Sequence, residues 1–199
     1  MLTKGAHSHS HRRYVAAYSG FALVIAVAVV GLMVSVRMAQ SAARESACTG
    51  HVFKITLALT DYRRVHGRFP KPVVHNSSGA LAHSWRIVIL PQLGYDELYR
   101  QYDFDRPWNG PHNLKVLSQM PTVYTCPNCS SKEYTSYFMQ GDKERPVIVI
   151  EMNHQSIPWT EPRDLLGKQS ADAACDPHGF AFGLFDGSVG RGDTIPEIQ

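Results

Sequence analysis

The chain has 199 residues, of which 44% are hydrophobic and 19% are charged. This composition is too apolar for a chain that is disordered throughout, and the length suits one domain. The formal net charge of +3 is modest, so we expect no nucleic-acid partner.

The segment from Val15 to Val36 has no charged residue over 22 positions and consists mainly of Val, Ala, Leu, Ile and Met. At a rise of about 1.5 Å per residue, a helix of this length is about 33 Å long, which matches a hydrocarbon core of about 30 Å. The sequence therefore predicts a transmembrane helix over residues 14–36, with membrane lipid as its surroundings. A purely cytosolic globular protein is excluded.

The orientation of this helix does not follow from counting basic residues. Three basic residues precede it, Lys4, Arg12 and Arg13, and the first three that follow it are Arg37, Arg44 and Lys54. A short tail with adjacent Arg12 and Arg13 is costly to translocate, and all four cysteines follow the helix, as suits an oxidising compartment. We therefore expect a single-pass protein of the cell membrane, with the basic, His-rich residues 1–13 in the cytoplasm and the C-terminal domain outside it.

The helical pattern continues beyond the apolar segment. Apolar residues recur at helical spacing on a polar background, at Val52, Ile55, Leu59 and Tyr62. No proline interrupts the chain between Tyr14 and Val65, and Gly67 and Pro70 then form a stop signal. The sequence predicts an amphipathic helix over residues 37–66, continuous with the membrane helix and entering an extracytoplasmic domain of residues 67–199.

The remainder of the chain predicts short helices and then strands. We expect a loop over Pro72–Ser84, a short helix or strand over Trp85–Leu90, and helical segments over Asp96–Tyr102 and Asn113–Ser118. The predicted strands are Thr122–Cys126, Tyr134–Met139, Val147–Met152 and Phe180–Val189, with a hairpin turn at Asp186-Gly187. The predicted fold class is α+β, a long N-terminal helix packed on a C-terminal antiparallel sheet.

This plan resembles that of type IV pilins and pseudopilins. Arg12-Arg13 followed by Gly20-Phe21-Ala22-Leu23-Val24 is similar to the prepilin peptidase site behind a basic leader. The resemblance implies cleavage after Gly20, before Phe21, and contact with other pilin-like subunits through the N-terminal helix. Ile25 stands where the family has a glutamate that serves subunit assembly, so the chain departs from the family at that position.

Further along, the chain resembles the bacterial prepilin-like family named domain of unknown function 1559. The resemblance lies in short motifs in the family's order, which include Ala42-Ala43-Arg44-Glu45, Cys48, Gly67-Arg68-Phe69-Pro70, Ser84-Trp85-Arg86, Pro107-Trp108, His112-Asn113, Cys126-Pro127 and Asp186-Gly187-Ser188-Val189. The family's C-terminal His-x9-Asp-Gly signature is altered, because Asp176 occupies the histidine position. The resemblance implies a membrane-anchored, extracytoplasmic domain without an assigned biochemical task.

The four cysteines allow three kinds of chemistry. Cys126-Pro127-Asn128-Cys129 has the spacing of a redox dithiol, and together with Cys175 and His178 these two cysteines would make a tetrahedral zinc set. An oxidising compartment and an even number of cysteines favour two disulfides. Cys48 and Cys126 match positions of the resembled family, which implies that they form one bridge and leaves Cys129 with Cys175.

No pattern in the sequence indicates a catalytic centre or a cofactor. A Ser-His-Asp arrangement, a carboxylate pair and a phosphate-binding loop are all lacking, so we expect no catalytic residue and no enzyme. Two hypotheses follow. The first is a pilin-like protein with a structural or interaction role, and the second is an extracytoplasmic binding or thiol/zinc module on a membrane anchor.

Overall fold

The structure is a computed structural model, and it describes residues 6–79, 82–128, 134–139, 147–152, 156–164 and 179–192. The chain divides into two compact units, Met1–Ala43 and Arg44–Gln199, and each is described by itself.

The helix α1, Ala6–His66, is 61 residues long and supplies the described part of the first unit. Every side chain from residue 20 to residue 44 is exposed, although most are apolar. By length and composition this helix can cross a membrane, as the sequence predicts. The absence of proline explains its continuity, because no backbone N–H is lost along its length. The prediction of one helix running from the apolar segment to the stop at Gly67 is confirmed.

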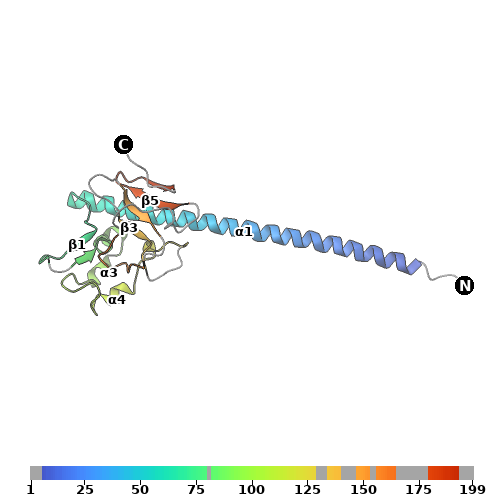
Figure 1. The fold of residues 1–199 in the computed structure, drawn as a ribbon, viewed down its shortest axis with the longest axis horizontal. Helices are drawn as coiled ribbons and strands as arrows, with labels where there is room; N and C mark the ends of the chain where they lie inside the picture. The colour runs from blue at the N-terminus through green and yellow to red at the C-terminus, as the bar shows by residue number, and fades with distance from the viewer. Residues whose placement is uncertain are drawn as a thin grey trace. The chain divides into compact units, whose positions relative to one another are not determined.

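The second unit contains the end of α1, short helices and two antiparallel sheets (Figure 1). Its described helices and 3-10 turns are α2 Trp85–Val88, η1 Pro91–Leu93, α3 Asp96–Gln101, α4 Leu114–Leu117 and η2 Thr122–Tyr124. Its described strands are β1 Val73–His75, β2 Ala82–Ser84, β3 Tyr137–Met139, β4 Val147–Glu151, β5 Phe180–Leu184 and β6 Val189–Gly192. The strands β3, β4, β5 and β6 are neighbours in that order, and β1 pairs with β2. The fold is therefore α+β, with a long N-terminal helix and a C-terminal antiparallel sheet.

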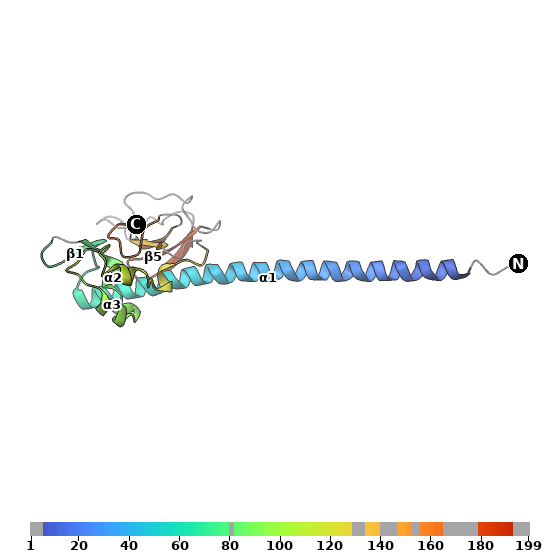
Figure 2. The same ribbon diagram turned by 90° about the horizontal axis from the view of Figure 1, so that it is seen from below.

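The last turns of α1 form part of the core of the second unit. Val52, Ile55 and Leu59 are fully buried, at the spacing that the sequence predicts for an amphipathic helix. Figures 1 and 2 both place this part of α1 beside the four-stranded sheet. Thr56 of α1 lies directly against Gly183 of β5, and a Cβ at Gly183 would overlap the Thr56 side chain. The close approach of helix and sheet therefore depends on glycine at this position.

Replacing Gly183 with alanine is expected to lower the free energy of unfolding by about 1–3 kcal/mol, because the new methyl group has to displace the helix or the strand. Gly50 of α1 is the matched control, since a Cβ there meets no atom within 4 Å and alanine favours a helix. Denaturant unfolding of the two variants should show a loss for Gly183→Ala and none for Gly50→Ala. Equal stability of both variants would contradict the packing of Thr56 on Gly183.

The turn between β5 and β6 confirms the predicted hairpin. Gly187 has a φ of 92°, which favours glycine, and its N–H donates to the carbonyl of Leu184 at 3.0 Å. The Asp186 carboxylate accepts from the Ser188 N–H at 2.8 Å.

Two other predictions about local structure are wrong. The predicted strand Thr122–Cys126 contains the 3-10 turn η2, because Pro121 begins a turn in which its carbonyl accepts from the Tyr124 N–H. The predicted loop Pro72–Ser84 contains the hairpin strands β1 and β2, in which Val73 pairs with Ser84. The segment Asn76-Ser77-Ser78-Gly79, which follows β1, consists of residue types that favour turns.

Candidate functional site

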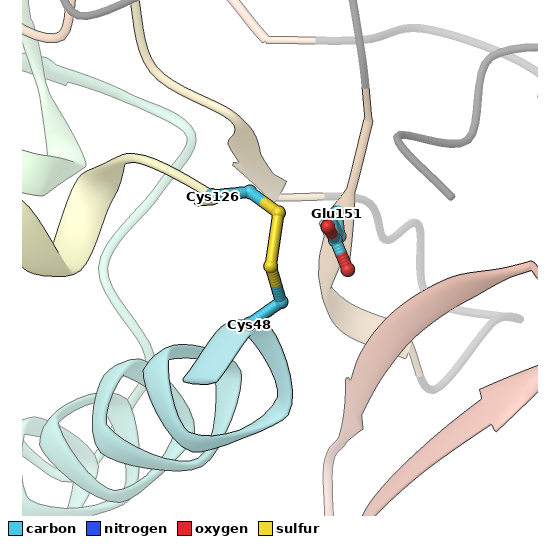
Figure 3. A group of neighbouring side chains, drawn as sticks. All are labelled: Cys48, Cys126 and Glu151. Atoms are coloured by element: carbon cyan, nitrogen blue, oxygen red, sulfur yellow. A yellow bond between two sulfur atoms is a disulfide. The ribbon is translucent and has the colours of Figure 1, made fainter. Parts of the chain in front are cut away.

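A buried disulfide joins Cys48 of α1 to Cys126, which follows η2 (Figure 3). Both cysteines are buried, and their Cα atoms are 5.2 Å apart. The Cys126 N–H donates to the Ser136 hydroxyl at 3.1 Å, which ties this loop to the segment that enters β3. The bridge therefore fastens the long helix to the sheet region, and the pairing implied by the family resemblance is confirmed.

The carboxylate of Glu151, at the end of β4, lies beside this disulfide (Figure 3). One carboxylate oxygen and the two sulfur atoms all lie within 4.8 Å of one another, and all three residues are buried. The contacts of Glu151 Oε2 include the Ala181 N–H at 3.1 Å and Arg191 Nη1 at 3.7 Å. These contacts from β5 and β6 offset part of the cost of burying a carboxylate.

Two more titratable side chains lie near the disulfide. The Tyr137 hydroxyl donates to the Cys48 carbonyl at 3.4 Å, and the His51 ring shares a hydrogen bond of 3.0 Å with the Thr125 carbonyl through Nδ1. Burial raises the pKa of Tyr137, and the negative charge of Glu151 raises it further. Burial lowers the pKa of His51, which the Thr125 carbonyl opposes. Both side chains are therefore held in their neutral forms at pH 7.

The other predictions for the cysteines are the zinc set, the redox dithiol and the second disulfide. The zinc set would need a thiolate at Cys126, whose sulfur is bonded to Cys48. The other three members of that set, Cys129, Cys175 and His178, lie outside the described residues. The redox dithiol Cys126–Cys129 would need the same Cys126 sulfur, which is bonded to Cys48. The second bridge Cys129–Cys175 stays a prediction. Sequence reasoning did not select Glu151, although an acid that directly ends the apolar run of residues 147–150 was a usable signal.

A buried ion pair lies elsewhere in the core, between Arg86 of α2 and Asp164. Their side chains are 0% and 3% exposed, and Arg86 Nη2 lies 2.7 Å from Asp164 Oδ1. Asp164 also accepts from Trp85 Nε1 at 2.6 Å and from the Met139 N–H at 3.0 Å. Arg86 donates to the Tyr137 carbonyl through Nε and Nη2. These contacts join α2, β3 and the segment around Asp164, and they satisfy the buried charges of both partners.

A buried histidine, His83 of β2, belongs to an aromatic cluster. Its Nδ1 shares a hydrogen bond of 2.8 Å with the Tyr102 hydroxyl, and the rings of Tyr102 and Phe104 contact it edge-on. Burial lowers the pKa of His83, and His75 lowers it further, whereas the Phe104 backbone, Asp103 and Asp105 oppose the shift. The folded chain therefore favours the neutral imidazole.

This preference predicts loss of stability in mild acid. An unfolded histidine titrates near pH 6.5, so below that pH the unfolded chain binds a proton that folded His83 resists. The contribution is complete above about pH 6.5 and falls by at most about 1.4 kcal/mol per pH unit between that value and the lower folded pKa. Unfolding curves at pH 7 and pH 5 should differ less for His83→Gln than for the wild type. The same difference for both proteins would contradict the assignment to His83.

Comparison with models of known protein families shows to which family the chain belongs. The model of the family described as Protein of unknown function (DUF1559) matches residues 37–171. The chain belongs to this family. No curated protein and no solved structure matched it. The DUF1559 region includes the disulfide, Glu151 and the Arg86–Asp164 pair, whereas the apolar part of α1 before residue 37 and the turn at Asp186 lie outside the match.

Proposed function

We propose that this DUF1559 protein is a single-pass, membrane-anchored, pilin-like protein whose domain is extracytoplasmic and has a structural or interaction role. The observation that carries the proposal is α1 itself. One uninterrupted helix contains both an exposed apolar stretch long enough to cross a bilayer and residues buried in the core of the domain. An apolar stretch of this length is unfavourable in water and favourable in lipid.

The buried disulfide supports the extracytoplasmic side of the proposal. Structural disulfides form and persist mainly in oxidising compartments, and Cys48–Cys126 lies in the domain rather than in the apolar stretch. Arg12 and Arg13 before the span support a cytoplasmic N-terminus. The chain is then oriented with residues 1–13 in the cytoplasm and the domain on the extracytoplasmic side of the membrane.

The pilin-like part of the proposal concerns the partner of the N-terminal helix. The segment Gly20-Phe21 fits a prepilin-type cleavage site, and the helix that follows it is the surface through which other pilin-like subunits would pack. Ile25 replaces the acid that would pair with the new amino group at Phe21, and an unpaired charge in an apolar assembly is costly. We therefore propose an anchored protein or a minor subunit of an assembly rather than a fibre former, with no catalytic role.

Membrane attachment is tested with a charge in the middle of the apolar stretch. Val29→Arg is expected to shift full-length protein from the alkali-resistant membrane fraction to the soluble or aggregated fractions, since arginine at a span centre costs about 2.5–3.5 kcal/mol. Val65→Arg is the matched control, because Val65 is an exposed valine of the same helix beyond this stretch. Equal membrane retention of both variants would contradict the anchor.

Topology and processing need separate readouts. Protease added to spheroplasts should digest the domain and leave the N-terminal tail protected, and digestion only after lysis would reverse the orientation. Mass spectrometry after co-expression with a prepilin peptidase should find an N-terminus at Phe21, and an intact leader would remove the processing claim. Abundant wild-type filaments seen with antibody to the domain would contradict the minor role that Ile25 implies.

A further inference from the structure

Cys48, Cys126 and Glu151 form a buried group of potential metal ligands, which a membrane anchor does not require. We propose that reduction of the Cys48–Cys126 disulfide creates a zinc site whose ligands are the two thiolates and the Glu151 carboxylate. The bridge and the metal site are then alternative states of the same residues. The proposal does not depend on membrane attachment or on pilin-like processing.

The distances among Cys48, Cys126 and Glu151 suit a tetrahedrally coordinated zinc ion. Zinc binds thiolates at about 2.3 Å and carboxylates at about 2.0–2.2 Å, so two thiolates on one zinc ion are about 3.8 Å apart. Side-chain rotation can provide this separation after reduction, because the Cα atoms of Cys48 and Cys126 are already 5.2 Å apart. Glu151 has an oxygen within 4.8 Å of both sulfur atoms in the bridged state. The three ligands would leave one tetrahedral position for a fourth ligand.

The charges of the group also suit a divalent cation. Two thiolates, one carboxylate and Zn²⁺ sum to one negative charge, and Arg191 lies 3.7 Å from Glu151 Oε2 to balance it. The Ala181 N–H donates to the same oxygen and orients the carboxylate, which is the role of an outer partner in metal sites. Without the ion, two buried thiols would stay protonated beside a carboxylate, since burial disfavours thiolates.

The change between the two states balances in electrons and protons. A dithiol reductant transfers two electrons to the bridge by thiol–disulfide exchange, and it becomes a disulfide itself while Cys48 and Cys126 become thiols. Zinc then displaces the two thiol protons as it binds. In the reverse direction an oxidised dithiol donor, itself a disulfide, takes the two electrons by thiol–disulfide exchange and becomes two thiols, while the two thiolates close the bridge and release the ion. The domain would therefore hold zinc when reduced and lose it when the bridge closes.

The test uses full-length protein in detergent, with Cys129 and Cys175 replaced by serine so that only Cys48 and Cys126 supply sulfur. The protein is reduced without oxygen on an immobilised dithiol and titrated with Co²⁺ as the probe. We expect one equivalent to bind with sulfur-to-cobalt charge-transfer absorption, to be displaced by Zn²⁺, and not to bind the oxidised protein. Glu151→Gln should weaken binding by more than about tenfold. The control Glu161→Gln changes an acid outside this group and should bind as the parent does.

Several results would overturn the proposal. They are absence of thiolate-bound cobalt in the reduced protein, equal affinity in Glu151→Gln, and binding that appears only when Cys129 and Cys175 are restored. The last result would favour the set of Cys126, Cys129, Cys175 and His178 instead. Thermal unfolding of the reduced protein guards against loss of the fold, because zinc must raise its midpoint if the site forms in the native state. Reduced protein that stays unfolded with zinc present would also count against the site.

Discussion

Replacing Asp164 with alanine is expected to lower the free energy of unfolding of the domain by about 3–5 kcal/mol. The substitution leaves the Arg86 guanidinium, which is 0% exposed, without the carboxylate 2.7 Å away. It also removes the acceptor for Trp85 Nε1 and for the Met139 N–H. A buried charge without its partner is desolvated and uncompensated. This substitution is therefore expected to be among the most destabilising single changes in the domain.

Two control variants separate the loss of the buried ion pair from the general effect of removing an acidic side chain. Asp164→Asn keeps an acceptor oxygen at the same place and should lose less stability than Asp164→Ala. Glu161→Ala removes the acid of a nearby pair whose Arg163 side chain is 56% exposed, so its expected loss is below about 1 kcal/mol. Denaturant midpoints with a constant m-value measure all three changes. A loss for Asp164→Ala as small as that for Glu161→Ala would contradict the buried pair.

The sequence predicted the elements that have a strong period or an unambiguous stop. The α1 helix follows from an apolar segment, an amphipathic continuation and the absence of proline, and each of these is a local property of the chain. The β5–β6 hairpin follows from Asp186-Gly187, because glycine there permits the positive φ of the turn. In the apolar run Trp85–Leu90 the sequence left helix or strand open, and the Ser84 hydroxyl that accepts from the Arg86 N–H favours the helix α2.

The features that were not predicted depend on pairing that the local composition does not show. The strands β1 and β2 have three residues each and are defined by their pairing rather than by their composition. Arg86 lies in the apolar run Trp85–Leu90, and its partner Asp164 is 78 residues away in the sequence. Glu151 lies beside the disulfide because the fold brings β4 close to Cys48 and Cys126, which are distant from it in the sequence. Local patterns do not contain such juxtapositions, whereas the Cys48–Cys126 pairing was reached through the family resemblance.

Replacing Cys126 with alanine is expected to destabilise the oxidised protein by about 2–5 kcal/mol. The bridge closes a large loop, since its cysteines are 78 residues apart in sequence, and it restricts the unfolded chain accordingly. In the folded chain it fastens Cys48 of α1 to a loop that Ser136 connects to β3. Alanine suits both positions because the cysteines are buried and a serine hydroxyl would need a new partner.

A double-mutant cycle decides whether this loss comes from the bridge. Cys48→Ala, Cys126→Ala and the double variant should lose similar stability, because the first substitution already removes the covalent bond and only small packing terms remain. The three variants should also respond less to reductant than the wild type does. Peptide mapping without reduction should recover the Cys48 peptide joined to the Cys126 peptide in the wild type. Additive losses in the cycle, or a map that joins Cys126 to Cys129, would show that α1 is fastened to the sheet region by packing alone.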